Sequence, residues 1–83
     1  MTNDYQPISC ATYDLLELAC MHHYKLHITQ KSGEVIEGTA MDMQIENHQE
    51  FILLQLADGH EIRLRLDSLH AFSHERFGVQ YLE

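Results

Sequence analysis

The spacing of apolar residues changes once along this chain, and that change constrains the fold more than any other feature. Within residues 12–23, Leu15, Leu18 and Ala19 recur at the intervals typical of an amphipathic helix. From residue 24 onward, apolar residues alternate with polar ones or form short apolar runs, a pattern typical of β-strands. The sequence therefore predicts one short helix followed only by β-structure.

Turn residues divide the second part of the chain into five or six strands. Gly33 and the pair Asp58-Gly59 can adopt the backbone conformations that tight hairpins need. The alternation changes phase between residues 38 and 41, which predicts a bulge or sharp bend there. The expected strands are 24–30, 35–47, 51–56, 62–66, 69–72 and 79–82.

These elements predict a mainly β protein, a small and strongly bent antiparallel barrel of five to six strands with one N-terminal helix. We expect a single domain over residues 1–83, with an irregular arm at 1–11, the helix at 12–23 and the barrel at 24–83. At the helix start, Asp14 and Glu17 have the spacing of a capping box led by Asp14.

Charge separates the possible classes of partner. Five Lys and Arg residues stand against 13 Asp and Glu, a formal net charge of −8, so direct binding to nucleic acid is not expected and a basic partner fits better. No Lys or Arg precedes Lys25, whereas Asp4, Asp14 and Glu17 do. Asp14 and Glu17 share one flank of the predicted helix, which is either favourable for the helix dipole or a docking edge for a basic groove.

Length and hydropathy set further limits. A chain of 83 residues is too short to hold a deep substrate cavity beside a core, so we expect no enzymatic activity. No apolar run is long enough to cross a membrane, and residues 1–4 lack the start of a signal peptide. We therefore expect a cytoplasmic protein that does not contact membranes and is a monomer when free.

The cysteines and histidines invite a metal or redox hypothesis. Cys10, Cys20, His22 and His23 are residue types that bind zinc, but helical spacing places Cys20 and His22 on different sides and leaves Cys10 in the arm. We expect buried free thiols and packed or hydrogen-bonded histidines, with no metal and no cofactor.

Several blocks of this sequence resemble the Rof family, Rho-binding antiterminators also called YaeO. The blocks are Tyr5-Gln6-Pro7-Ile8 with Cys10, then 13–20 (YDLLELAC) with His22-His23, and later 63–67 (RLRLD) with Phe72-Ser73-His74. The resemblance implies an Sm-like fold. It also implies a non-enzymatic inhibitor that binds the N-terminal region of the transcription terminator Rho and blocks the primary RNA-binding site.

The resemblance implies which residues contact Rho. The family's helix acids match Asp14 and Glu17, with Tyr13 beside them, while Thr12 and Asp4 are lesser candidates. A second contact is implied at Glu46-Asn47-His48, although relatives can carry basic residues where this chain has Glu46.

Two alternatives from other classes stay open. An Sm-like fold could instead bind RNA, but here Arg63 and Arg65 alternate with Glu61 and Asp67, whereas such proteins need unopposed cations and stacking aromatics. A metal-dependent or redox protein is the third class.

Overall fold

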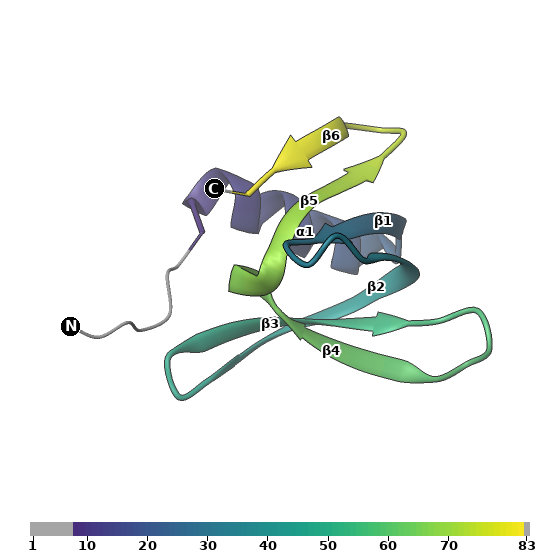
Figure 1. Cartoon of the computed structure of the whole chain (residues 1–83), viewed down its shortest axis with the longest axis horizontal. Helices are drawn as coiled ribbons and strands as arrows, with labels where there is room; N and C mark the ends of the chain where they lie inside the picture. The colour runs from purple at the N-terminus through teal and green to yellow at the C-terminus, as the bar shows by residue number, and fades with distance from the viewer. Residues whose placement is uncertain (1–7, 83) are drawn as a thin grey trace.

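The computed structural model describes residues 8–82 and contains one helix and six antiparallel strands in one sheet (Figure 1). The mainly β class with one N-terminal helix is therefore confirmed. The elements are α1 (Cys10–His22), β1 (Lys25–Gln30), β2 (Val35–Glu46), β3 (Gln49–Gln55), β4 (Glu61–Arg65), the 3-10 turn η1 (Leu66–Ser68), β5 (Leu69–His74) and β6 (Gly78–Tyr81).

The strand order in the sheet is β4-β3-β2-β1-β5-β6. Strands β1 to β4 follow one another as hairpins, and after η1 the chain returns so that β5 pairs with the free side of β1. Within residues 8–82 no ladder joins β4 to β6, so these strands are the two ends of the sheet. The Sm-like label and a closed barrel accordingly stay predictions.

Positive backbone φ angles close the first three hairpins. Gly33 and Gly59 have φ values of 96° and 93°, which glycine adopts without a steric penalty. Between β2 and β3, Asn47 and His48 have φ values of 53° and 65°, and the strands pair directly on either side of them. Two consecutive positive values are typical of a type I′ hairpin turn.

Strand β2 changes register against β3 between Ala40 and Asp42, which confirms the predicted bulge. Just before it, Gly38 is buried, and a Cβ atom there would lie 3.2 Å from both the Gln55 carbonyl oxygen and the Leu54 Cβ. Glycine therefore lets the two backbones approach closely where β2 bends.

The core lies between α1 and the bent sheet. Helix α1 packs chiefly on β2 and buries Leu16, Ala19 and Cys20. Leu18, which shares the helical apolar spacing with Leu15 and Ala19, is instead 39% exposed. The strands and η1 contribute the other core residues: Leu26, Ile28, Ala40, Ile52, Leu54, Leu66, Leu69, Phe72 and Leu82.

The predicted helix start was wrong. Helix α1 begins at Cys10, and Ser9 caps it by accepting a hydrogen bond from the Thr12 backbone N–H at 3.2 Å. The Ser9 hydroxyl thus satisfies a backbone N–H of the first helical turn, which is the capping role predicted for Asp14. Residues 10 and 11 of the predicted arm are thus helical, and residues 1–7 lie outside the described part.

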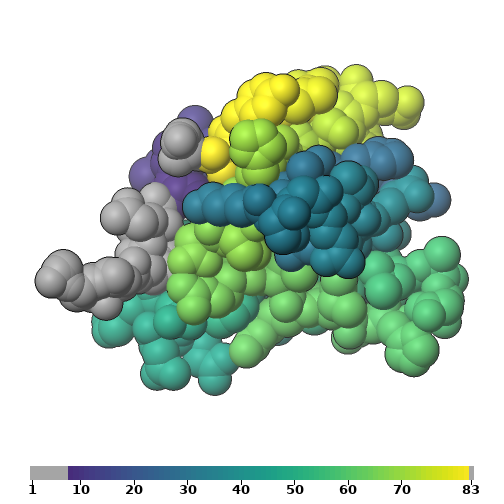
Figure 2. All heavy atoms as spheres, in the orientation of Figure 1, coloured from purple at the N-terminus to yellow at the C-terminus, as the bar shows by residue number. Residues whose placement is uncertain are grey.

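Helix α1 lies on one side of the molecule. In the view of Figure 2 only its purple edge is visible, because β1 and β5 lie in front of it.

Candidate functional site

The two helix acids that the sequence singled out both face solvent. Asp14 and Glu17 are exposed on α1, and within residues 8–82 neither forms a salt bridge. The four pairs found there involve other acids. The carboxylates of Asp14 and Glu17 are therefore open to an incoming partner.

The helix dipole does not account for these acids. With the helix starting at Cys10, Asp14 is its fifth residue and Glu17 its eighth, and the first turn holds no acid. The attraction of a carboxylate to the helix dipole fades beyond the first turn. The interpretation of Asp14 and Glu17 as dipole-stabilising residues was therefore wrong. Their interpretation as a docking edge stays a prediction.

Tyr13 and Thr12 are both half-buried on the same helix. Burial raises the pKa of the Tyr13 hydroxyl, and the nearby charges of Glu17 and Glu50 raise it further. Thr12 accepts a hydrogen bond from the Ser9 hydroxyl at 2.9 Å. Tyr13 thus marks a region of negative potential, while the hydroxyl of Thr12 is engaged within the helix cap. Asp4 lies outside the described residues.

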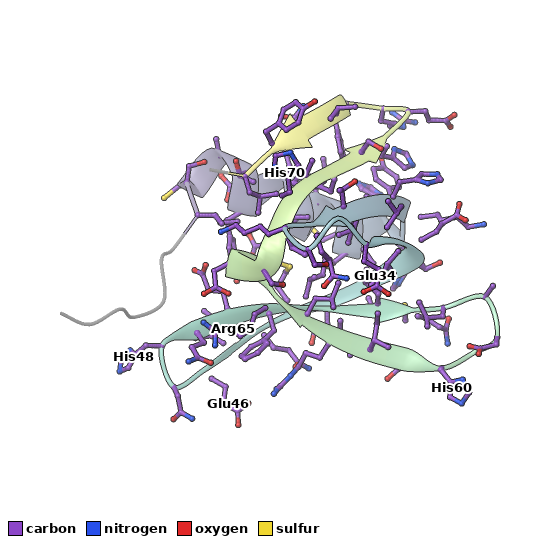
Figure 3. All side chains as sticks on the ribbon, in the orientation of Figure 1. Glu34, Glu46, His48, His60, Arg65 and His70 are labelled. Atoms are coloured by element: carbon purple, nitrogen blue, oxygen red, sulfur yellow. The ribbon has the colours of Figure 1, made fainter. Side chains whose placement is uncertain are left out.

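The second predicted contact lies at the turn between β2 and β3. Figure 3 shows His48 at its tip and Glu46 beside it, and Glu46, Asn47 and His48 are all exposed. Glu46 accepts a hydrogen bond from Arg63 Nη1 at 2.8 Å. The charge of Glu46 is therefore offset locally, unlike those of Asp14 and Glu17.

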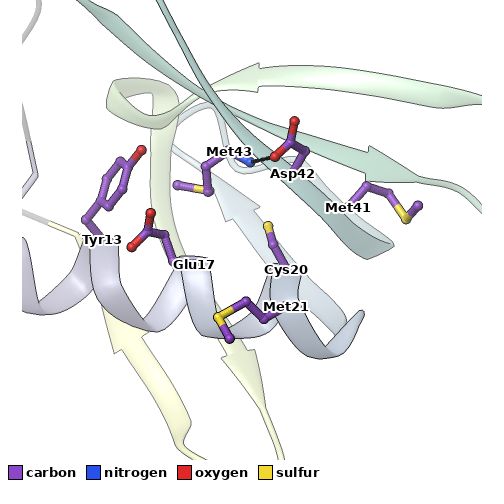
Figure 4. Close-up of a pocket in the computed structure, with 7 residues that line it drawn as sticks. All are labelled: Tyr13, Glu17, Cys20, Met21, Met41, Asp42 and Met43. Carbon is purple, nitrogen blue, oxygen red and sulfur yellow. Dashed lines mark hydrogen bonds between the residues drawn. The ribbon is translucent and has the colours of Figure 1, made fainter.

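A groove of about 330 Å³ runs between α1 and β2, and we call it the α1–β2 groove (Figure 4). Four of its residues come from the helix and three from the strand at its bulge. Its lining consists of Tyr13, Glu17, Cys20, Met21, Met41, Asp42 and Met43.

Sequence reasoning missed Asp42, although one signal was available. The predicted bulge lies immediately before this residue, and bulges redirect neighbouring side chains. Asp42 is exposed, and its Oδ1 accepts a hydrogen bond from the Met43 backbone N–H at 2.9 Å. The position of α1 over β2, which brings Glu17 and Asp42 to one groove, could not be read from the sequence.

Of the four cysteines and histidines considered for metal binding, one is buried and three are exposed. Cys20 is buried as expected, but Cys10 is exposed, contrary to the prediction. The His22 ring stacks on Tyr24 with ring centroids 5.3 Å apart, and His23 Nδ1 lies 3.3 Å from the Ala40 carbonyl oxygen. In the described part of the chain, no three His, Cys, Asp or Glu residues are grouped to hold a metal ion.

Burial also sets the chemistry of the one thiol in the groove. The pKa of Cys20 is raised to about 11. Burial is the largest cause, and the charges of Asp42 and Glu17 raise the pKa further. Cys20 is therefore a neutral thiol at physiological pH, which makes it a poor nucleophile and a poor metal ligand.

Comparison with known proteins assigns the chain to a family. A family model described as "Modulator of Rho-dependent transcription termination (ROF)" matches residues 7–80. The chain belongs to the Rof family. Protein rof of Escherichia coli (strain K12) is 41% identical over 79 residues, which cover 95% of this chain and 93% of that protein. Protein rof of Shigella flexneri matches with the same values.

A solved structure agrees with this assignment. The structure titled "YaeO bound to Magnesium from Vibrio cholerae O395" has a TM-score of 0.74 and 34% sequence identity to this Rof chain. The match covers 86% of this chain and 97% of the other. The resemblance to the Rof family found from the sequence is therefore confirmed, and this chain acts in the modulation of Rho-dependent transcription termination.

Within residues 8–82, α1 is too short and insufficiently apolar to cross a membrane.

Proposed function

We propose that this Rof chain inhibits Rho-dependent termination by binding the N-terminal region of Rho through the acidic face of α1. It acts by binding and not by catalysis, and it keeps RNA from the primary site. It does so in the cytoplasm, as a monomer before it binds. The observation that carries the proposal is the exposed pair Asp14 and Glu17, which has no salt-bridge partner within residues 8–82.

The proposed contact face is broader than the two acids. One face of α1 presents four residues together, because they are three or four positions apart along the helix. They are Asp14, Glu17, Leu18 and Met21. Leu18 and Met21 are 39% and 74% exposed. A helix that combines acids with exposed apolar residues suits a groove that is basic and partly apolar.

Charge competition explains how such a contact would inhibit Rho. A site that binds RNA must offer cations to the phosphates, and a protein with a net charge of −8 is attracted to the same cations. A chain bound there excludes RNA because both partners need the same positive groups.

The turn between β2 and β3 is a secondary contact in this proposal. Asn47 and His48 are exposed at its tip and are available for hydrogen bonding. Glu46 is the weakest candidate of the three, because Arg63 already holds its carboxylate.

The alternative of direct RNA binding gains no support from the geometry. Arg63 pairs with Glu46 and lies 4.0 Å from the centre of the Phe51 ring. Arg65 donates two hydrogen bonds to Asp67, at 3.0 and 2.6 Å. Both arginines are thus engaged by groups of this chain, which weakens any attraction to phosphates.

Reversing the two helix charges tests the proposal. The double variant Asp14→Lys/Glu17→Lys should keep its fold, because both residues are exposed and lysine favours helices. Its affinity for Rho, measured by titration calorimetry, should fall by roughly a hundredfold or more, since two attractive charges become repulsive.

The matched control is Glu61→Lys/Glu75→Lys, which replaces two exposed acids outside α1. Each double variant shifts the formal net charge of −8 by four units, to −4. The control should lose far less affinity than the helix variant. Equal losses in both variants would mean that overall charge, and not this face of α1, determines binding.

A further inference from the structure

The α1–β2 groove combines two kinds of side chain, thioethers and carboxylates. Met21, Met41 and Met43 supply three flexible thioethers, while Glu17 and Asp42 supply carboxylates from two different elements. Met21 is 74% exposed, so it contributes little to the core of the free protein. Thioethers adapt to whatever side chain they contact.

This combination matches the shape and chemistry of a long cationic side chain. Lysine and arginine pair an apolar stem with a charged head, and the groove offers an apolar lining with carboxylates. Its volume of about 330 Å³ lies at the lower end for small-molecule sites. It therefore suits one or two side chains better than a large ligand.

No cation of this chain fills that role. The five basic residues all lie within the described range, and none lines the groove. Arg63 and Arg65 are paired with Glu46 and Asp67. The raised pKa values of Tyr13 and Cys20, to which Glu17 and Asp42 contribute, are consistent with negative potential that nothing in the groove offsets.

We propose that the α1–β2 groove receives a lysine or arginine side chain of Rho, held between Glu17 and Asp42 with its stem against the methionines. The inference rests on the proposed function for the identity of the partner. It goes further because Asp42 and the methionines of β2 lie outside the helix face, and because Asp14 does not line the groove.

The groove can be observed directly with methionine labelled at the methyl carbon. On addition of intact Rho, the NMR signals of Met21, Met41 and Met43 should shift or broaden strongly, because a side chain enters among them. Signals that stay unchanged at saturating Rho would overturn the inference.

A conservative variant provides the second measurement. Asp42→Asn removes the charge but keeps an oxygen that can accept the hydrogen bond from the Met43 N–H, so the fold should be retained. Affinity for Rho should fall by roughly tenfold or more. The control Glu61→Gln makes the same charge change at an exposed residue of β4 and should bind like the wild type.

The outcomes separate this inference from the proposed function. If the wild type binds Rho and Asp42→Asn binds equally well, only the groove inference fails. If Asp14→Lys, a change outside the groove, keeps full affinity while Asp42→Asn loses it, the helix proposal fails and the groove inference stands. If Asp14→Lys/Glu17→Lys keeps full affinity, both fail, because Glu17 belongs to the helix face and to the groove. Absence of any binding between the wild type and Rho would overturn both.

Discussion

At Cys20, burial and two carboxylates act on one thiol in the same direction. All three raise its pKa, to about 11 from an ordinary value near 9. The folded protein therefore holds the thiol proton at pH values where the unfolded chain has released it. Deprotonation at high pH thus favours unfolding.

This difference predicts how stability depends on pH. The contribution of Cys20 should be constant below about pH 9, and the free energy of unfolding should then decrease between pH 9 and 11. Two pKa units correspond to a loss on the order of 2 to 3 kcal/mol. Tyr13, whose pKa is also raised, adds a decrease of the same sign above about pH 10.

Urea titrations at several pH values measure the effect. Cys20→Ala should have a lower free energy of unfolding throughout, because a buried side chain is truncated, but a flatter dependence between pH 9 and 11. Identical slopes in the wild type and in Cys20→Ala would show that the thiol is not the group responsible.

Single residues also show the limits of sequence reasoning at the site. Asp14 and Glu17 could be predicted as exposed acids because helical spacing alone placed them on one flank. Asp42 could not be assigned to the same region, because its approach to Glu17 depends on how α1 lies across β2. The ion pair of Glu46 with Arg63 likewise joins residues 17 positions apart, and no local pattern indicates it.

Among the elements, α1 depends on a cap that was predicted at Asp14 and is formed by Ser9. Both Ser9 and Asp14 are good N-cap residues, and the capping-box spacing favoured Asp14. The observed choice of Ser9 adds a turn that carries Cys10 and Thr12, and it moves both acids to the middle of the helix.

Removing the cap tests this assignment. Ser9→Ala should lower the free energy of unfolding by about 1 kcal/mol, because the Thr12 N–H loses its acceptor. Thermal or urea denaturation measures the loss. Ser9→Asp can still accept that hydrogen bond and should retain most of the stability. A neutral result for Ser9→Ala would place the functional cap elsewhere.

The strands were more predictable than the helix for a physical reason. Alternation along 61–65 and the glycines at 33 and 59 are local features that determine a strand and its turns directly. The bulge in β2 was also visible, because a change of phase cannot be accommodated in a regular strand. The pairing of β5 with β1 is a long-range choice that local patterns do not determine.

For the whole molecule, the arrangement of charge matters more than its sum. The net charge is −8. Around β4, the acidic residues lie near Arg63 and Arg65. Helix α1, by contrast, contains no Lys or Arg to oppose its acids. Binding through α1 should therefore be oriented as well as attractive.

The central claim is that this Rof chain and RNA compete for the primary site of Rho. The direct measurement is the affinity of Rho for a fluorescent pyrimidine-rich RNA at increasing concentrations of the chain and fixed salt. Simple competition predicts that the apparent dissociation constant of the RNA rises linearly with the concentration of free chain. Formation of a ternary complex, in which the chain binds Rho while the RNA keeps its original affinity, would contradict the account.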